Sequence, residues 1–256
     1  MIDKEIVKTN FSRAADSYED YAVVQDYMGQ VLADMIDDKT NSQTILELGA
    51  GTGLFTEKLL AKLPETSYLL VDLAPSMIEQ CQNKFSAYDN IDYLVADAEQ
   101  SNWEGEYDLI VANATVQWFK NLEKTIKKFK EHLKEDGSIY FSTFGQDNFK
   151  EFAECCNGVL EGGFAQNFKS KRELISLVAS EFRAINIKEE EYVEKFTTVR
   201  EFLRATKKIG ANSAKENKPQ LPPNKLRQLE NLYREKYSVD GQIIVTHHLL
   251  FVELSI

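Results

Sequence analysis

The chain has 256 residues, of which 43% are hydrophobic and 28% charged, enough apolar sequence to bury the core of one large domain. Its formal net charge of −11 argues against a nucleic-acid-binding protein, which needs a positive surface opposite the phosphates. No stretch approaches the roughly 18 consecutive apolar residues that cross a bilayer, and the first twenty residues lack a secretory signal pattern. Three cysteines, two of them adjacent, make no disulfide framework. We therefore expect a cytoplasmic protein that binds neither nucleic acid nor membrane.

The first half of the chain alternates between strand and helix patterns. Residues 44–49, TILELG, form a short apolar run ended by glycine, as in a buried strand. Further strands are predicted over 67–73, 91–97, 107–113 and 138–144, and helices over 53–63, 75–85 and 121–137. Gly137 is predicted to stop the last of these helices. This alternation predicts an α/β fold with a parallel sheet covered by helices.

The segments on either side of this core are predicted to be mainly helical. The first forty residues favour helix, as do 147–162 and 171–182, whereas 184–196 and 241–256 favour strands. Residues 197–237 predict two helices joined by the loop NKPQLPPN. We therefore expect a single domain, 1–256, with a helical cap (1–40), a ligand-binding core (41–145) and a helical insertion (197–241).

Three glycines at alternate positions, Gly49, Gly51 and Gly53, stand between the first predicted strand and the first core helix. Glycines at such a junction let backbone N–H groups and a helix N-terminus approach a ligand closely. The dinucleotide fingerprint G-x-G-x-x-G would need a third glycine where Leu54 stands. A P-loop is excluded because no Gly-Lys-Ser/Thr follows.

Three acids lie at the ends of predicted strands. Asp72 ends the second strand, where a carboxylate can accept hydrogen bonds from ribose hydroxyls, and Asp97 ends the third, where it can accept from an adenine amino group. Either acid alone can equally be a solvated loop residue. Glu47, at the end of a buried strand, needs a cationic or donor partner, which a sulfonium and an amino group would supply.

The motifs ILELGAGTG, VDLAPSM, VADAE and YDLIVANATVQWF, in this order over residues 44–144, resemble the class I S-adenosylmethionine-dependent methyltransferases. The resemblance implies a Rossmann-like, mostly parallel seven-stranded sheet with an antiparallel last strand, helices on both faces, and S-adenosylmethionine as methyl donor without a metal. Leu73 and Met77 would sandwich the adenine, although both can also be core residues. The implied cofactor-binding residues are Tyr18, Tyr21, Glu47, Gly49, Ala50, Gly51, Gly53, Asp72, Leu73, Met77, Asp97, Ala98 and Asn113.

Further segments, among them NFSRAADSYEDYAVVQ, FSTFG, LRATKKIGAN and VTHHLLF, resemble the malonyl-acyl-carrier-protein O-methyltransferases of biotin synthesis, the BioC family. This resemblance spans nearly the whole chain. It implies methylation of the free carboxylate of a malonyl thioester, carried by acyl carrier protein or coenzyme A. Two alternatives stay open: a methyltransferase of a quinone or other small molecule, and a non-catalytic protein that binds S-adenosylmethionine.

The implied chemistry needs few catalytic groups. A carboxylate acceptor with a pKa near 4 is already ionised at neutral pH, so alignment with the donor replaces a general base. Tyr18 and Tyr21 of the cap are predicted to bind the methionine carboxylate or the acceptor; the alternative, above all for Tyr21, is that the ring only packs. Arg204 is predicted to clamp the malonyl carboxylate with its planar fork, or else to be a surface residue. The three histidines, His132, His247 and His248, are expected to be surface or strand residues.

The charge is unevenly distributed along the chain. Residues 197–236 hold ten basic and four acidic side chains, a local +6 that leaves −17 for the rest of the −11 chain. A positive segment on an otherwise negative protein can steer an acidic carrier protein into one orientation. The alternative is that these side chains only solvate two surface helices.

Overall fold

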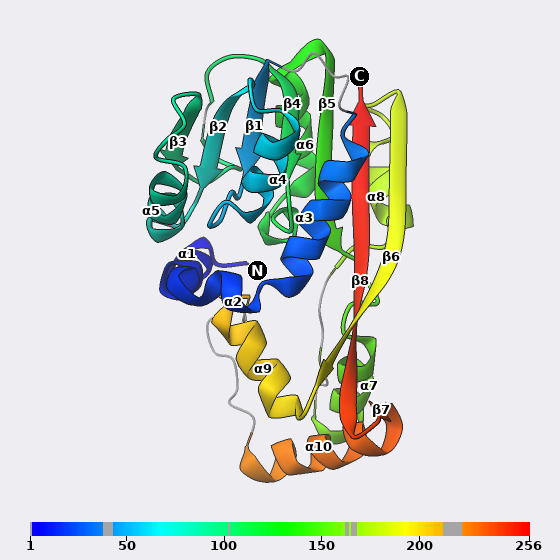
Figure 1. Cartoon of the computed structure of the whole chain (residues 1–256). Coiled ribbons are helices and arrows are strands. Elements are labelled where there is room, and N and C mark those ends of the chain that lie inside the picture. The colour runs from blue at the N-terminus through cyan, green and yellow to red at the C-terminus, as the bar shows by residue number, and fades with distance from the viewer. Residues whose placement is uncertain (1, 38–42, 102, 162–163, 165–167, 212–221) are drawn as a thin grey trace.

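The computed structural model describes residues 2–37, 43–101, 103–161, 164, 168–211 and 222–256. Its centre is a mixed sheet with the strand order β3-β2-β1-β4-β5-β8-β6 (Figure 1). The strands are β1 (Thr44–Leu48), β2 (Ser67–Asp72), β3 (Ile91–Val95), β4 (Tyr107–Ala112), β5 (Leu133–Phe144), β6 (Ala184–Phe196) and β8 (Gln242–Ser255). The first five are parallel, and β8 runs antiparallel to both β5 and β6. These pairings confirm the predicted mostly parallel sheet with an antiparallel last strand. A two-residue strand, β7 (Ser238–Val239), also pairs with β8 and is an eighth strand that was not predicted.

Helices cover both faces of the sheet, as predicted. They are α3 (Val23–Met35), α4 (Leu54–Lys62), α5 (Pro75–Lys84), α6 (Leu122–Glu131) and α8 (Lys171–Val178). One apolar cluster joins α3, α4 and α5 to one face of the sheet, and a second joins α6 and α8 to the other. The two clusters take alternate residues of each strand, Ile45 facing the first and Leu46 the second, as the pleat of a sheet requires.

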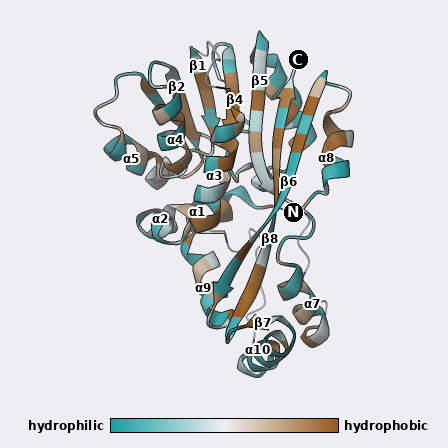
Figure 2. Cartoon of the chain, turned by 45° about the vertical axis from the view of Figure 1, so that its right-hand side comes forward, coloured by the Kyte–Doolittle hydropathy of each residue, from teal (hydrophilic) through white to brown (hydrophobic). Residues whose placement is uncertain are grey.

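The last two long strands extend beyond the parallel part of the sheet (Figure 1). Residues 249–255 of β8 pair with both β5 and β6, whereas residues 244–248 pair with β6 alone and Ile243 pairs with β6 and β7. This two-stranded extension carries α7 (Lys150–Val159), α9 (Val199–Lys208) and α10 (Pro223–Tyr237), which share an apolar cluster of their own. Figure 2 shows hydrophobic residues along β8 and many hydrophilic residues along β6, the edge strand.

The cap consists of α1 (Lys4–Ala14), a 3-10 turn η1 (Ala15–Ser17), α2 (Tyr18–Tyr21) and the start of α3. Asp3 begins α1 by accepting hydrogen bonds from the N–H groups of Glu5 and Ile6. In Figure 1, α1 and α2 lie at the end of the sheet where the parallel strands finish. A second 3-10 turn, η2 (Val116–Trp118), follows β4 at the same end. Among the described residues, no helix is both long and apolar enough to span a membrane.

One predicted boundary is wrong. The helix predicted over 121–137 ends at Glu131, and β5 begins at Leu133, so Gly137 lies inside a strand and stops no helix. The pairing of β5 with β4 is irregular here, and a Cβ at position 137 would lie 3.0 Å from the Lys134 carbonyl oxygen and 3.1 Å from that of Tyr107. Glycine is needed for this close approach of backbone. The two helices predicted within 197–237 are present, while residues 217–221 of their predicted linker lie outside the described residues.

Candidate functional site

The glycine loop joins β1 to α4, and its three glycines have different roles. All have positive φ, +71° at Gly49, +59° at Gly51 and +88° at Gly53. A Cβ at Gly49 would lie 2.2 to 2.8 Å from side-chain atoms of Thr115, and one at Gly53 would lie 2.4 Å from Phe85. At Gly51 a Cβ would meet nothing within 4 Å. Packing therefore requires the outer two glycines, and the middle one is open to a ligand.

Asp72 is fixed against this loop by backbone donors. Its Oδ2 accepts a hydrogen bond of 3.0 Å from the Gly51 N–H, and its Oδ1 accepts one of 2.7 Å from the Ala74 N–H. Burial raises the pKa of Asp72 above its ordinary value, although these N–H groups act in the opposite direction. Each carboxylate oxygen holds one donor and can accept another, so the group is positioned for a diol at the end of β2.

Glu47 is a buried carboxyl group without a cationic partner. Its side chain is 1% exposed, and its Oε2 accepts a hydrogen bond of 2.8 Å from Thr56 Oγ1. No lysine, arginine or histidine of the described chain forms an ion pair with it. Burial raises the pKa of Glu47 to about 8, although the hydrogen bond from Thr56 acts in the opposite direction. The free protein therefore holds this group largely protonated at neutral pH. A cationic ligand beside β1 would favour the ionised form.

Asp97 is ion-paired, which its sequence context did not indicate. Lys4 of the cap places its Nζ 3.1 Å from Asp97 Oδ1 and 2.6 Å from Glu99 Oε2. Ala98, predicted to line the adenine site, is buried between these two acids. The sequence carries no local signal that relates position 4 to position 97, so Lys4 could not be predicted as part of this site.

The structure separates the two tyrosines of the cap. Tyr18 packs with Phe11 against a small apolar cluster of Ala15, Ala74 and Met77, the last of which was predicted to contact adenine. Tyr18 thus lies beside Ala74, whose N–H donates to Asp72, and burial followed by the charge of Asp72 raises the pKa of Tyr18. Tyr21 is 38% exposed.

Tyr21 contacts the insertion instead of the loop. The Nζ of Lys208, on α9, lies 6.0 Å from the centroid of its ring. Leu73, the other predicted adenine contact, is partly buried and belongs to none of the four apolar clusters. The structure thus brings Tyr18 and Met77 together beside Asp72 and leaves Tyr21 at the contact between cap and insertion.

The side chain of Asn113 connects elements of the scaffold. Its Nδ2 donates to the Gln25 carbonyl oxygen of α3 at 2.9 Å, and its Oδ1 accepts from Ser142 Oγ of β5 at 2.6 Å. Its carbonyl oxygen accepts from Thr115 Oγ1 at 2.9 Å, and Thr115 packs on Gly49. Asn113 therefore holds the residue that shapes the glycine loop, while its amide group is already bonded within the protein.

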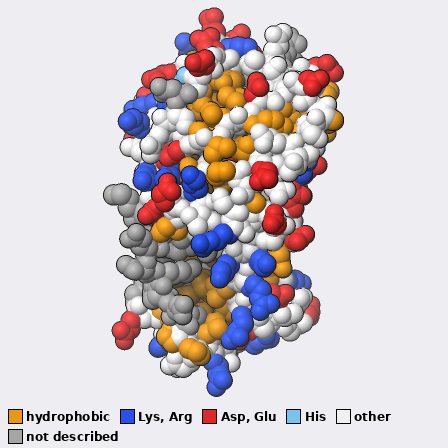
Figure 3. Space-filling model, turned by 90° about the vertical axis from the view of Figure 1, so that its left-hand side faces the viewer, with side chains coloured by type: hydrophobic (Ala, Val, Ile, Leu, Met, Phe, Trp, Pro, Cys, Tyr) orange, Lys and Arg blue, Asp and Glu red, His pale blue; other side chains and the backbone are white. Residues whose placement is uncertain are grey.

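Arg204 lies on an exposed basic face of α9. Arg200, Arg204, Lys207 and Lys208 are all exposed and follow the spacing of one helical face. Figure 3 shows Lys and Arg side chains gathered on this part of the surface. In Figures 1 and 2, α2 lies between α9 and the end of the sheet that carries the glycine loop.

Three of the four basic residues of α10 have partners, whereas Arg227 is exposed with no partner among the described residues. Lys236 pairs with Glu154, Arg234 pairs with Glu230, and Lys225 donates to the Val159 carbonyl oxygen. Lys215 and Lys218 lie outside the described residues. Within the described insertion, the charges of α9 are therefore more available to a partner than those of α10.

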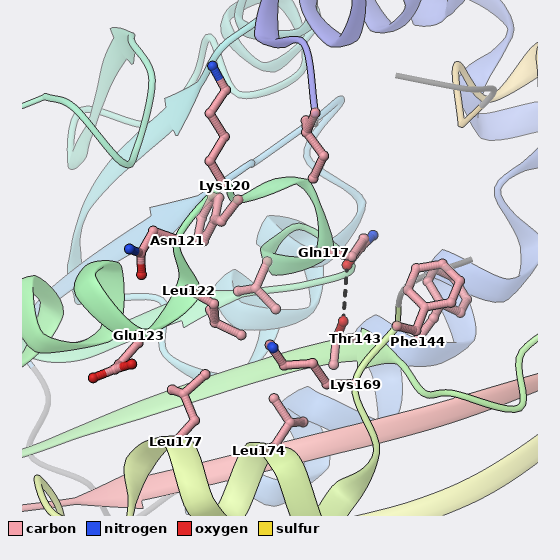
Figure 4. Close-up of a pocket in the computed structure, with 14 residues that line it drawn as sticks. Gln117, Lys120, Asn121, Leu122, Glu123, Thr143, Phe144, Lys169, Leu174 and Leu177 are labelled. Atoms are coloured by element: carbon pink, nitrogen blue, oxygen red, sulfur yellow. Dashed lines mark hydrogen bonds between the residues drawn. The ribbon is translucent and has the colours of Figure 1, made fainter. Parts of the chain in front are cut away.

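A cavity of about 440 Å³ opens at the ends of β4 and β5 (Figure 4). Thr143 of β5 and Gln117 of η2 point toward each other across it, with Thr143 Oγ1 donating to Gln117 Oε1 at 3.3 Å. Phe144, Phe168 and Leu174 supply apolar walls. Because η2 directly follows Thr115, which touches Gly49, this cavity lies beside the glycine loop. A second cavity of about 550 Å³ lies between the cap and α5 and includes Thr52 of the loop.

Comparison with known proteins identifies the family. A profile described as a methyltransferase domain matches residues 46–139, from β1 to β5. The malonyl-[acyl-carrier protein] O-methyltransferase 2 of Ilyobacter polytropus is 36% identical over 257 residues, which cover 99% of this chain and 98% of the relative. The chain belongs to the malonyl-[acyl-carrier protein] O-methyltransferase family.

Solved structures agree with this family's fold. The YcgJ protein of Bacillus subtilis superposes with a TM-score of 0.64 at 13% identity and covers 90% of this chain and 97% of its own. A phosphoethanolamine N-methyltransferase of Haemonchus contortus, solved with S-adenosylhomocysteine, gives a TM-score of 0.56 at 16% identity and covers 90% of this chain and 52% of its own. These likenesses confirm the predicted class I methyltransferase fold.

The histidines of this methyltransferase have structural partners. His247 and His248, on β8, are buried, and each places its Nε2 2.7 Å from a glutamate of β6, Glu194 and Glu189 respectively. His132 lies at the end of α6, with its Nδ1 3.1 Å from the Gly105 carbonyl oxygen. The prediction that all three are surface or strand residues is confirmed.

Proposed function

We propose that this protein transfers a methyl group from S-adenosylmethionine to the free carboxylate of a malonyl thioester, the first step of pimeloyl assembly for biotin. The observation that carries the proposal is identity over nearly the full chain to a relative named for malonyl-[acyl-carrier protein] O-methylation. The open Gly51 beside the fixed Asp72 supports binding of the donor. The Haemonchus structure of the same fold was solved with S-adenosylhomocysteine, the demethylated form of that donor.

The residues at the ends of β1, β2 and β3 fit the donor's three parts. Asp72 would bind the ribose hydroxyls and the Gly51 backbone would face the methionine part, where no Cβ obstructs it. Glu47, buried without a cation, would meet the amino and sulfonium groups. Asp97 would accept from the adenine amino group, with Met77 against the ring. When bound, S-adenosylmethionine supplies an electrophilic methyl group on a sulfonium sulfur.

The cavity at the ends of β4 and β5 would hold the acceptor. Its position beside the glycine loop suits an acceptor that must meet the donor's methyl group in line. The apolar walls exclude water. Gln117 Nε2 donates one N–H to the Ala114 carbonyl oxygen, and its second N–H can donate to a malonyl carbonyl group. Since a carboxylate needs no deprotonation, the chain's residues have only to align it and keep it unsolvated.

Tyr18 and Arg204 remain the predicted acceptor-side residues. Tyr18 lies near Asp72, and its raised pKa keeps the phenol neutral, so it can donate a hydrogen bond to a carboxylate of the donor or acceptor. Arg204 is predicted to bind the malonyl carboxylate, and its guanidinium group is exposed on α9. If Tyr21 contributes to the same site, it would do so from its position beside Lys208 of α9.

The exposed basic face of α9, formed by Arg200, Arg204, Lys207 and Lys208, would dock an acidic carrier protein. Charge complementarity is the argument, because the rest of the chain is strongly negative and would repel such a partner elsewhere. The same face contacts the cap through Lys208 and Tyr21, which supports docking of the carrier close to the cap. Coenzyme A, which is also an anion, is the alternative carrier.

The competing functions predict different substrates. A quinone methyltransferase would need a base near the acceptor, and none of the three histidines lines the acceptor cavity. A non-catalytic binding protein would bind the donor without turnover. The full-length family relationship favours the enzyme over both.

Radiolabelled S-adenosylmethionine distinguishes these possibilities when it is supplied with malonyl and acetyl thioesters of carrier protein and of coenzyme A. We expect label in a methyl ester of the malonyl thioesters and none in the acetyl thioesters, which lack the free carboxylate. Equal labelling of a quinone, or donor binding with no labelled product, would contradict the proposal.

A further inference from the structure

Lys4 is a buried cation that joins the cap to the ends of the core strands. It is 9% exposed, and its Nζ lies 3.1 Å from Asp97 Oδ1, 2.6 Å from Glu99 Oε2 and 5.1 Å from the centroid of the Phe119 ring. A lysine this buried is rarely tolerated unless carboxylates compensate its charge. The first turn of α1 is thus anchored on the loop after β3.

The geometry leaves one oxygen of Asp97 available. Its Oδ1 accepts from Lys4 and also, at 3.1 Å, from the Glu99 N–H. The described residues donate no hydrogen bond to Oδ2. The carboxylate is therefore held by one oxygen, and the other is free to accept from an incoming donor such as an exocyclic amino group.

Glu99 extends the contact to the rim of the acceptor cavity. Its Oε2 accepts from the Lys120 N–H at 2.8 Å and its Oε1 from the Asn121 N–H at 2.9 Å, and both residues line that cavity. Burial alone would raise the pKa of Glu99, but the Asn121 N–H, Lys4 and the Lys120 N–H outweigh it and lower the pKa. Glu99 thus stays ionised and holds Lys4 between two carboxylates.

We propose that Lys4 is a positioning residue that orients Asp97 toward the adenine amino group of the cofactor and so couples attachment of the cap to recognition of that base. The inference rests on the proposed function, because it requires S-adenosylmethionine in the site. Without Lys4, Asp97 and Glu99 would repel each other, and the Asp97 carboxylate would lose the contact that fixes its orientation. The ribose contact at Asp72 would remain.

Other ion pairs attach α2 and α3 of the cap to the core independently of Lys4. Lys84 binds Glu19 of α2 at 2.6 Å, and Lys58 binds Asp26 of α3 at 2.7 Å. The removal of Lys4 therefore tests orientation of Asp97 separately from attachment of the cap. Lys8, one turn further along α1 and with no side-chain partner among the described residues, offers a control that removes the same charge from the same helix.

The test compares the binding of S-adenosylhomocysteine with that of S-inosylhomocysteine, which carries an oxygen in place of the adenine amino group. Titration calorimetry on the full chain should show that Lys4→Met reduces the preference for the adenosyl ligand about tenfold, since a buried acceptor loses its orientation. Lys4→Arg and Lys8→Met should keep the preference of the wild type. The fluorescence of Trp118, whose ring centroid lies 5.6 Å from that of Phe11 of α1, reports whether α1 stays packed in place in each variant.

Each outcome is decisive. An unchanged preference in Lys4→Met, or an equal loss of affinity for both ligands, would overturn the positioning role and leave Lys4 a structural contact. If Lys4→Met binds neither ligand, Lys4→Gln, which removes the charge but keeps a polar side chain at the site, is measured instead and judged by the same two criteria. A wild-type protein that binds neither ligand would refute the proposed function and not the role of Lys4 alone.

Discussion

The ends of β1, β2 and β3 hold their polar groups with backbone hydrogen bonds and close packing, whereas α9 presents its charged groups on an exposed helical face. Asp72 is fixed by two N–H donors and Gly49 is enclosed by Thr115. Arg200 and Lys207 of α9 contact no described side chain through an ion pair. The first region is preorganised for a small ligand, and the second is suited to steering a large, mobile one.

This difference has a consequence for mutations. A substitution at the strand ends should change affinity for the cofactor whatever the acceptor is, because the geometry there is rigid. A substitution on α9 should act only when the acceptor is carried by a protein, because exposed charges act at long range and are screened by salt. Experiments that compare equivalent changes in the two regions test this distinction.

The largest effect is expected for Gly49→Ala. The new Cβ would lie 2.2 Å from Thr115 Oγ1 in a backbone of positive φ, which costs about 3 kcal/mol of folding free energy and distorts the loop. Urea unfolding should show this loss, and cofactor binding should be abolished. The double variant with Thr115→Gly, which removes the clashing atoms, should recover part of the stability. A stable, active Gly49→Ala protein would refute this account of the loop.

Asp72→Ala should weaken cofactor binding by about 2–3 kcal/mol, because a charged acceptor of two hydrogen bonds is lost. Titration calorimetry with S-adenosylhomocysteine measures the effect directly. Asp92→Ala, an exposed aspartate on the neighbouring strand β3, serves as the control and should bind normally. Unchanged affinity in Asp72→Ala would remove the ribose assignment.

Glu47 should make cofactor binding depend on pH. Its pKa of about 8 in the free protein means that it is protonated at pH 7, and a bound sulfonium and amino group would favour the carboxylate. Binding should therefore release a proton, and affinity should rise by up to about tenfold per pH unit below pH 8 and level off above it. Calorimetry in buffers of different ionisation enthalpy counts the proton; Glu47→Gln should release none.

The same group affects the stability of the free protein with the opposite dependence. Its folded pKa lies above the ordinary value of 4.5, so the folded state binds more protons between these two values. The contribution of Glu47 to stability is thus fully present below about 4.5 and is lost as the pH rises through 8. A pH series of urea unfolding without ligand should show this loss, and Glu47→Gln should flatten it.

Gly51→Ala, at the strand ends, has a matched control in Gly241→Ala, in the turn between β7 and β8. Both glycines have positive φ, +59° and +79°, and neither would bring a Cβ within 4 Å of another atom. Each substitution should cost about 1 kcal/mol of stability. Only Gly51→Ala should also weaken the binding of S-adenosylhomocysteine, by about fivefold, because its methyl group enters the open side of the loop. Equal binding by both variants would show that no ligand approaches Gly51.

The sequence predicted the polar residues at the strand ends better than it predicted the residues of the cap that pack over them. Glu47, Gly51 and Asp72 could be placed because parallel strands bring their carboxyl ends to one edge, so position along the chain determines position in space. Lys4 could not be placed, since its partner lies 93 residues away and no periodicity connects them.

The prediction for Gly137 was wrong because a glycine after a helical pattern resembles a helix stop, whereas here it relieves backbone crowding in β5. The opposite placements of Tyr18 and Tyr21 follow from cap packing, which neighbouring positions in a sequence do not reveal.

The smallest effect is expected on α9, and it should be confined to the carrier-bound substrate. Lys207→Glu with Lys208→Glu reverses two exposed charges and should lower kcat/KM for malonyl-carrier protein about threefold at physiological salt, where screening acts over about 8 Å. The wild-type rate with that substrate should also fall as salt rises, while the rate with a short malonyl thioester should hardly change.

A matched control separates docking from net charge. Lys124→Glu with Lys195→Glu reverses two exposed lysines on α6 and β6, so it changes the total charge equally but leaves the face of α9 intact. If carrier docking depends on α9, this control should retain most of the wild-type rate with malonyl-carrier protein. Equal losses in both double variants would mean that the carrier senses only the net charge of the protein. Equal losses on the short thioester would mean that Lys207 and Lys208 support the site itself through their contact with the cap.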